Sequence, residues 1–75
     1  MSAAANQKRL GLNIAAARDA AGMTQEQLAD ASGMHFTAIS RLERGVRAPR
    51  FHTLIQVADA LKVPPGQLLD GISKP

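Results

Sequence analysis

The sequence predicts an all-α domain, a compact bundle of five short helices. Apolar residues recur at intervals of three and four along most of the chain, and no segment shows the strict alternation that a strand requires. Glycine or proline interrupts the pattern often enough to keep each helix short. Because 75 residues can build one hydrophobic core but not two, we expect residues 1–75 to form a single domain.

The first helix is expected over residues 7–21. Its apolar face comprises Leu10, Ile14, Ala17 and Ala21. Gly22 follows, and glycine favours the left-handed backbone that ends many helices. Residues 1–6 have neither an amphipathic pattern nor turn residues, so we expect a frayed lead-in there.

The second and third helices are expected to be joined by one tight turn. Thr24 and Gln27 match a capping box, in which each side chain bonds the backbone N–H of the other residue. The second helix then covers residues 25–31, and Gly33 ends it. The third helix follows at once over residues 35–44.

The third helix has two chemically different faces. Its inward face carries Ala38, Ile39 and Leu42. Its outward face carries Phe36, Thr37, Ser40, Arg41 and Arg44. An apolar side that holds a helix on its domain, with hydrogen-bonding and cationic groups opposite, is what reading DNA base edges and phosphates requires.

Two further helices are expected after the loop 46–49. The fourth ends before Pro64, which cannot continue a helix. Its expected core face is Phe51, Leu54, Ile55, Ala58 and Leu61. The fifth is short, and its apolar residues are Leu68, Leu69 and Ile72. These three residues belong either to the core or to the interface of a homodimer, and the sequence leaves both readings open.

The composition argues against several classes of protein. The chain has no Cys, which removes disulfides, thiolate nucleophiles and Cys-based zinc sites and favours the cytoplasm. Apolar runs are too short for a transmembrane segment. His35 and His52 stand apart, and no acidic residues pair in a pattern that suggests a metal cage or a catalytic base. We therefore expect no enzyme, no metal and no cofactor.

Positive charge is concentrated in residues 41–50. This stretch holds four of the nine basic residues, Arg41, Arg44, Arg47 and Arg50, and a single acid, Glu43. Such an excess suits a polyanionic partner, although a solvated basic surface is the alternative. Because the cluster begins on the third helix, a helix-turn-helix motif formed by the second and third helices favours DNA as the partner.

Over residues 10–71 the chain resembles the Cro/repressor-type (XRE) helix-turn-helix family of phage-repressor-like DNA-binding domains. The resemblance rests on the segment Gly22 to Ala29, Gly33, Ile39, Ser40, Leu42, Glu43, Gly45, Pro49 and the apolar pattern of residues 54–61. In size and layout the chain is also similar to the controller proteins of restriction-modification systems. The resemblance implies a sequence-specific regulator of transcription that binds double-stranded DNA.

The resemblance also implies roles for individual residues. Gln25 stands where a phosphate contact lies, with simple helix capping as the alternative. Phe36, Thr37 and Arg41 stand where base readers lie, although Phe36 can instead pack inward and Arg41 can sit near phosphate. Arg44, Arg47 and Arg50 match contacts to the DNA backbone. Arg18 and Glu43 match a structural pair that joins the first helix to the end of the third.

Two residues depart from the family pattern at helix starts. His35 replaces the usual Ser, Thr or Asp before the third helix, and Arg50 replaces the Ser before the fourth. A missing cap costs about 1 kcal/mol, and either DNA contacts offset this cost or the helices simply start less firmly.

The sequence therefore predicts a cytoplasmic DNA-binding regulator that binds a partly palindromic operator as a homodimer. The alternative is an antitoxin-like module that sequesters a partner protein and binds DNA only secondarily. A basic amphipathic membrane binder is a weaker third reading, because the arginines span a helix stop at Gly45.

Overall fold

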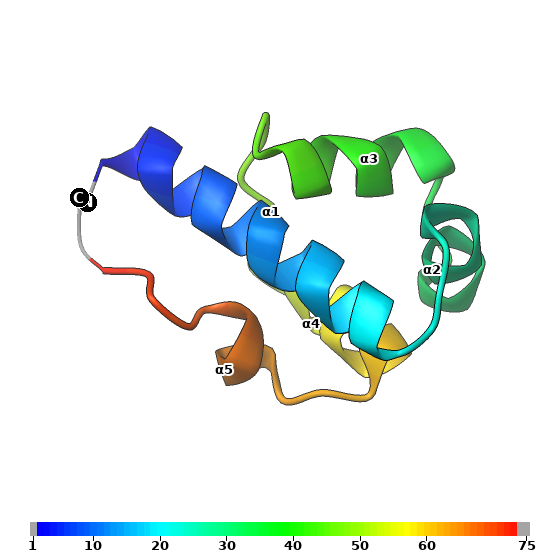
Figure 1. The fold of residues 1–75 in the computed structure, drawn as a ribbon. Helices are drawn as coiled ribbons and strands as arrows, with labels where there is room; N and C mark the ends of the chain where they lie inside the picture. Colours follow the sequence, from blue (N-terminus) through cyan, green and yellow to red (C-terminus); the bar gives the residue numbers. More distant parts are fainter. Residues whose placement is uncertain (1, 74–75) are drawn as a thin grey trace.

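The computed structural model describes residues 2–73, which form five helices and no strand (Figure 1). The helices are α1 (Ala3–Ala20), α2 (Gln25–Ser32), α3 (Phe36–Arg44), α4 (Phe51–Leu61) and α5 (Pro65–Leu68). In the view of Figure 1, α1 crosses the molecule diagonally, with α3 above it and α5 below it. α1 packs on α3 and α5, while α2 packs on α3 and α4. The predicted all-α bundle is confirmed.

The first helix begins at Ala3, four residues earlier than the sequence pattern indicates. Ser2 is its N-cap, and the Ser2 hydroxyl accepts a 3.0 Å hydrogen bond from the backbone N–H of Ala5. Alanine has the highest helix propensity, so a capped alanine run forms a helix without an apolar face. The expectation of a frayed lead-in is therefore wrong for residues 3–6, and Met1 lies outside the described residues.

The helix-turn-helix begins and ends as its local sequence predicts. The Thr24 hydroxyl accepts from the backbone N–H of Gln27 at 3.1 Å, and the Gln27 side chain accepts from the Thr24 backbone N–H at 2.8 Å. Gly33 and Gly45 end α2 and α3 in the left-handed conformation, with φ of 70° and 71°. Local signals thus mark both ends of α2 and the end of α3.

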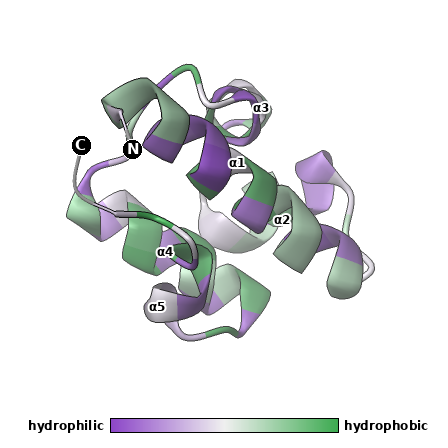
Figure 2. Cartoon of the chain, turned by 60° about the vertical axis from the view of Figure 1, so that its left-hand side comes forward, coloured by the Kyte–Doolittle hydropathy of each residue, from purple (hydrophilic) through white to green (hydrophobic). Residues whose placement is uncertain are grey.

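All five helices contribute side chains to the core. Its residues are Leu10, Ile14, Ala17, Leu28, Ala29, Ile39, Leu42, Leu54, Val57, Ala58, Leu61 and Leu68. In Figure 2, stretches of α4 are coloured as hydrophobic, whereas α3 is mostly hydrophilic or neutral. α4 is thus a strongly apolar element, whereas α3 joins the core by the narrow stripe of Ile39 and Leu42 and packs on α1 and α2.

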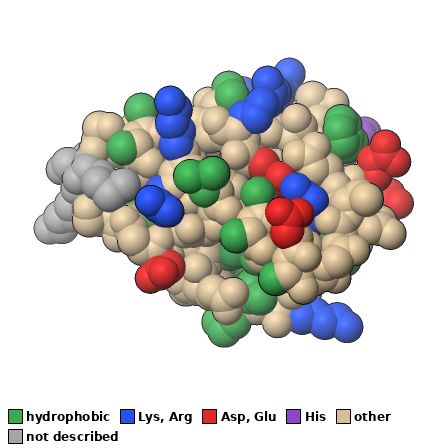
Figure 3. Space-filling model, viewed as in Figure 1, with side chains coloured by type: hydrophobic (Ala, Val, Ile, Leu, Met, Phe, Trp, Pro, Cys, Tyr) green, Lys and Arg blue, Asp and Glu red, His purple; other side chains and the backbone are tan. Residues whose placement is uncertain are grey.

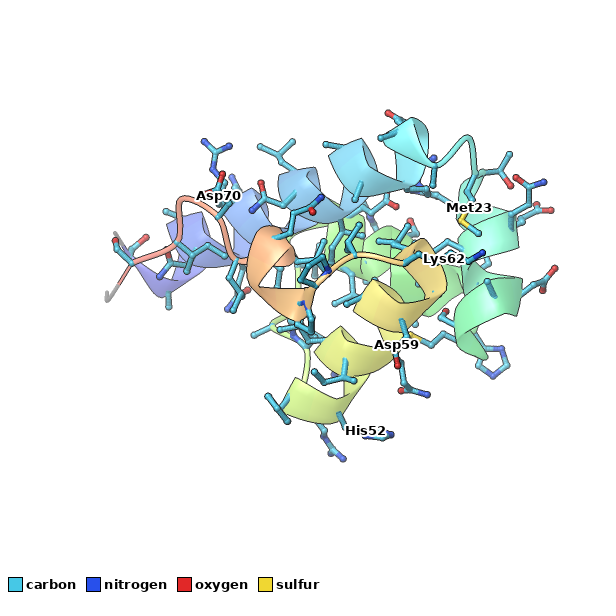
Figure 4. The ribbon with its side chains drawn as sticks, turned by 90° about the horizontal axis from the view of Figure 1, so that it is seen from below. Met23, His52, Asp59, Lys62 and Asp70 are labelled. Atoms are coloured by element: carbon cyan, nitrogen blue, oxygen red, sulfur yellow. The ribbon has the colours of Figure 1, made fainter. Side chains whose placement is uncertain are left out.

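The core face of α4 differs from the sequence expectation. Val57 is fully buried, whereas Phe51 is 80% exposed and Ile55 is only half-buried. The buried positions of α4 centre between Leu54 and Leu61, so Phe51, in the first turn, extends past the end of the core. Its neighbour His52 points away from the rest of the domain (Figure 4). The assignment of Phe51 to the core was wrong.

The C-terminal segment is held against α1 by Asn13. The Asn13 side-chain amide donates to the backbone carbonyls of Leu68 at 2.9 Å and Asp70 at 2.8 Å, and Figure 4 shows Asp70 beside α1. Leu68 is fully buried, which assigns it to the core and removes it from a dimer surface. Leu69 is 42% exposed and Ile72 is half-buried, so only these two remain available for such a surface.

A close backbone approach at Gly11 sets the packing of α1 against α3. A Cβ atom at Gly11 would collide with the carbonyl oxygen of Glu43 and lie 2.6 Å from that of Leu42. Because backbone atoms cannot move aside as the end of a side chain can, only glycine fits here. No sequence pattern distinguishes Gly11, since glycine inside a helix usually signals nothing more than lower helix propensity.

Replacing Gly11 with Ala should lower the free energy of unfolding by about 1–3 kcal/mol, because the added methyl forces α1 and α3 apart. Thermal denaturation followed by circular dichroism measures the effect. Gly66→Ala is the matched control, because a Cβ at Gly66 meets no atom within 4 Å. Wild-type stability of the Gly11→Ala variant would contradict the close approach described.

Candidate nucleic-acid interface

The outward face of α3 is accessible along the whole helix. Ile39 and Leu42 are buried and hold the helix on the domain. On the opposite side Thr37, Arg41 and Arg44 are exposed, and Ser40 is half-buried. The sequence correctly places Ile39 and Leu42 inward, whereas Ala38, also expected inward, is only half-buried. The outward face can therefore reach a partner.

Three of the predicted arginines line one groove. Arg41 of α3, Arg47 of the following loop and Arg50 before α4 border a hollow of about 510 Å³. Its apolar lining comes from Met34, Ala38, Leu42, Ala48 and Pro49. Figure 3 shows Lys and Arg side chains at two places on the upper edge of the molecule, over the first turns of α1 and over the end of α3. The groove therefore combines cationic and apolar side chains, which suits a sugar–phosphate strand.

Arg44 does not line this groove. Its side-chain Nε lies 3.4 Å from the backbone carbonyl of Ser40, one turn earlier in α3, and the Arg44 side chain stays exposed. The four arginines that cluster in the sequence thus divide into three around one groove and one on the exposed surface of α3.

Phe36 lies at the other end of α3, in a second hollow. The Phe36 side chain is 48% exposed, so it is not packed fully into the domain. The hollow is also lined by Thr24, Gln25 and Glu26 at the start of α2. Phe36, a predicted base reader, and Gln25, a predicted phosphate contact, therefore border the same depression.

Arg18 and Glu43 form a two-bond ion pair between α1 and α3. Arg18 Nε and Nη2 donate to the two Glu43 carboxylate oxygens, at 2.6 and 3.0 Å. Arg18 Nη1 donates to the backbone carbonyl of Met23 at 2.9 Å, and Asp19 adds a contact at 3.2 Å. The hydrogen bond to Glu43 raises the pKa of Arg18 above its usual value, against the opposing effect of burial. The pair is largely screened from solvent, with side chains 15% and 6% exposed.

Gln25 joins the same carboxylate. Its side-chain Nε2 donates to Glu43 Oε1 at 3.0 Å, so α2 is tied to the end of α3. The two residues are eighteen positions apart, and no periodicity or spacing in the sequence predicts the bond. Simple capping, the alternative for Gln25, is not what its side chain does, because Thr24 and Gln27 cap α2.

His35 and Arg50 occupy the N-cap positions of α3 and α4 without capping them. Both have extended backbones, and neither side chain bonds the first turn of its helix. Both side chains are exposed, so the two departures from the usual caps leave polar groups at the surface. By contrast, Ser2 and Thr24 cap α1 and α2 with side-chain oxygens.

Two other kinds of site, a metal centre and a membrane-spanning helix, have no counterpart in residues 2–73. Within residues 2–73 no group of three or more His, Asp or Glu side chains could hold a metal ion. In the same range no helix has the length and apolar character to span a membrane.

α2 and α3 are two short helices joined through Gly33, and α3 presents an exposed polar face beside arginines. This arrangement defines a helix-turn-helix domain. The sequence profile of the helix-turn-helix family matches residues 14–68, and this chain belongs to that family. The members of the family to which it is similar are regulators of transcription, and DNA-binding transcription regulation is the activity of this class.

Similar proteins and structures agree with this assignment. The chain is 43% identical over 56 residues to the HTH-type transcriptional regulator y4dJ of Sinorhizobium fredii, covering 75% of this chain and 73% of the relative. It is 40% identical over 60 residues to the control protein C.SmaI of Serratia marcescens, covering 80% and 71%. The crystal structure of the restriction-modification controller protein C.AhdI from Aeromonas hydrophila superimposes with a TM-score of 0.83 at 31% identity, covering 85% and 97%. The clp gene regulator ClgR from C. glutamicum gives 0.80 at 30% identity, covering 84% and 82%.

Replacing Arg18 with Ala should cost about 3 kcal/mol of folding stability, because Glu43 is then left buried with Gln25 as its only side-chain partner. Thermal denaturation measures the loss, and Lys8→Ala on the same helix serves as a control for removing a positive charge. DNA affinity, measured well below the melting transition, should change little. A variant that kept its melting temperature but lost DNA affinity would place Arg18 at the DNA surface instead.

Proposed function

We propose that this helix-turn-helix regulator binds a partly palindromic operator as a homodimer, with α3 in the major groove. The observation that carries the proposal is the continuity of the exposed face of α3 with the arginine groove formed by Arg41, Arg47 and Arg50. A helix that lies in the major groove has a sugar–phosphate strand beside it. One DNA duplex can therefore contact the exposed face of α3 and the arginine groove at the same time. The cytoplasmic location expected from the composition stays a prediction.

The exposed side chains divide into readers and backbone contacts by their positions. Phe36, Thr37 and Arg41 stand on α3, where side chains reach base edges, and Ser40 and His35 flank them. Arg44, Arg47 and Arg50 stand at the end of α3 and in the loop beyond it. We assign these three, together with Gln25, to the phosphate backbone.

Two-fold pairing is the natural way for a domain with one recognition helix to read a palindrome. Leu69 supports such pairing, because an apolar side chain 42% exposed next to half-buried Ile72 is suited to contact a second copy. These residues follow α5, which packs on α1 and α4 and not on α3. Pairing there would leave the DNA-facing side of α3 free.

The operator should be protected over two half-sites whose centres lie roughly 34 Å apart, one turn of DNA. Sequences enriched from a random DNA pool supply the operator, and footprinting gives the spacing. Leu69→Asp should weaken both dimerisation and DNA binding, whereas Leu69→Met should preserve them. Protection of one half-site at a one-to-one stoichiometry would refute the dimer. Enrichment of no DNA at all would favour the protein-sequestering alternative.

Replacing Arg41 and replacing Arg47 should weaken DNA binding in different ways. Arg41→Ala should cost about 1–3 kcal/mol on the operator and relax the preference at one base pair, because a bidentate contact to guanine carries sequence information. Arg47→Ala should weaken operator and scrambled duplexes alike and flatten the salt dependence by about one unit of log–log slope per contact. Titrations of both variants on both duplexes at several salt concentrations make the comparison. Equal losses for Arg41→Ala on the two duplexes would assign Arg41 to phosphate.

A further inference from the structure

The Glu43 carboxylate of α3 bonds a side chain from each of the two helices packed against α3, Arg18 of α1 and Gln25 of α2. Its oxygen Oε1 accepts from Arg18 of α1 and from Gln25 of α2, both at 3.0 Å. Its oxygen Oε2 accepts from Arg18 alone, at 2.6 Å. The ion pair by itself would need only Arg18, so the bond to Gln25 requires a separate explanation.

The bond to Glu43 fixes which end of the Gln25 amide faces which way. A carboxylate can only accept hydrogen bonds, so the Gln25 nitrogen must face Glu43 and the amide cannot turn over. An amide nitrogen carries two N–H groups, and Glu43 takes one of them. Glu43 is the only hydrogen-bond partner of the Gln25 side chain among residues 2–73. The second N–H is therefore a donor held at a fixed angle, on a side chain that lines the same hollow as Phe36.

We infer that Glu43 is a positioning residue for DNA binding: it orients the Gln25 amide so that an N–H, and not the amide oxygen, meets the DNA strand. This inference rests on the proposed assignment of Gln25 to a phosphate. A phosphate oxygen is an acceptor, so an amide turned the other way would oppose it with another acceptor. A donor held before binding also loses less conformational entropy when the strand arrives.

The first test compares the effect of Gln25→Met in two backgrounds. Met keeps the length of the side chain but removes the donor. In the otherwise wild-type protein the change should weaken operator binding by about fivefold per half-site, the effect of one hydrogen bond. In a Glu43→Gln background it should have little further effect, because the Gln25 amide is already free to turn over. Equal losses in both backgrounds would overturn the inference.

A matched control variant separates a loss of folding stability from a loss of operator affinity. Val57→Ala removes buried methyl groups from α4, away from the carboxylate, and should lower the melting temperature without changing operator affinity below the transition. Glu43→Gln should weaken operator binding at the same temperature. Losses in affinity that simply follow the melting temperature for both variants would show a structural role only. Glu43→Asp, which keeps the charge but shortens the reach, replaces Glu43→Gln if the latter does not fold.

The second test uses the wild-type protein and the side-chain amide resonances of Gln25, which Gln25→Met identifies by their loss. The two amide protons should have distinct shifts in the free protein, and operator DNA should move one of them while the proton bonded to Glu43 keeps its shift. Loss of that bonded signal on binding would overturn the inference. Failure of the wild-type protein to bind any DNA would instead refute the proposed function.

Discussion

The carboxylate of Glu43 is the interaction on which the geometry of the helix-turn-helix depends. It joins the last turn of α3 to Arg18 near the end of α1 and to Gln25 at the start of α2. Arg18 also bonds the carbonyl of Met23, which immediately precedes the cap of α2. One largely buried group thus relates the orientations of three helices, and the recognition helix could not tilt without breaking a charge-assisted bond.

Glu43 contacts α1 through its backbone as well as through its side chain. Its carbonyl oxygen leaves no room for a Cβ at Gly11, and its carboxylate bonds Arg18. Gly11 and Arg18 are seven residues apart, so they share one face of α1, two turns from each other. The glycine sets how closely the helices approach, and the arginine sets where α3 stops along α1. Neither constraint alone would define the position of α3.

The sequence predicted those features that depend on neighbouring residues. The capping box at Thr24, the left-handed ends at Gly33 and Gly45 and the two faces of α3 all follow from local patterns, and the structure confirms them. The exposure of Phe51 and the burial of Val57 could not be predicted, because they depend on where the core ends rather than on helical period. The bonds from Asn13 to the carbonyl of Leu68 and from Gln25 to Glu43 join residues distant in sequence. The resemblance indicated Arg18 with Glu43, but no pattern indicated Gln25 as a third member.

The distribution of helix caps separates stability from binding within this small domain. α1 and α2 begin with side-chain caps, from Ser2 and Thr24, whereas α3 and α4 begin at His35 and Arg50 without one. Each missing cap costs about 1 kcal/mol, and both fall on the helices that flank the arginine groove. The structure therefore places its strongest constraints behind the proposed DNA-binding face, in the core and around Glu43. The face itself carries exposed cations and uncapped helix starts, which stabilise the free domain little and remain available to a polyanion.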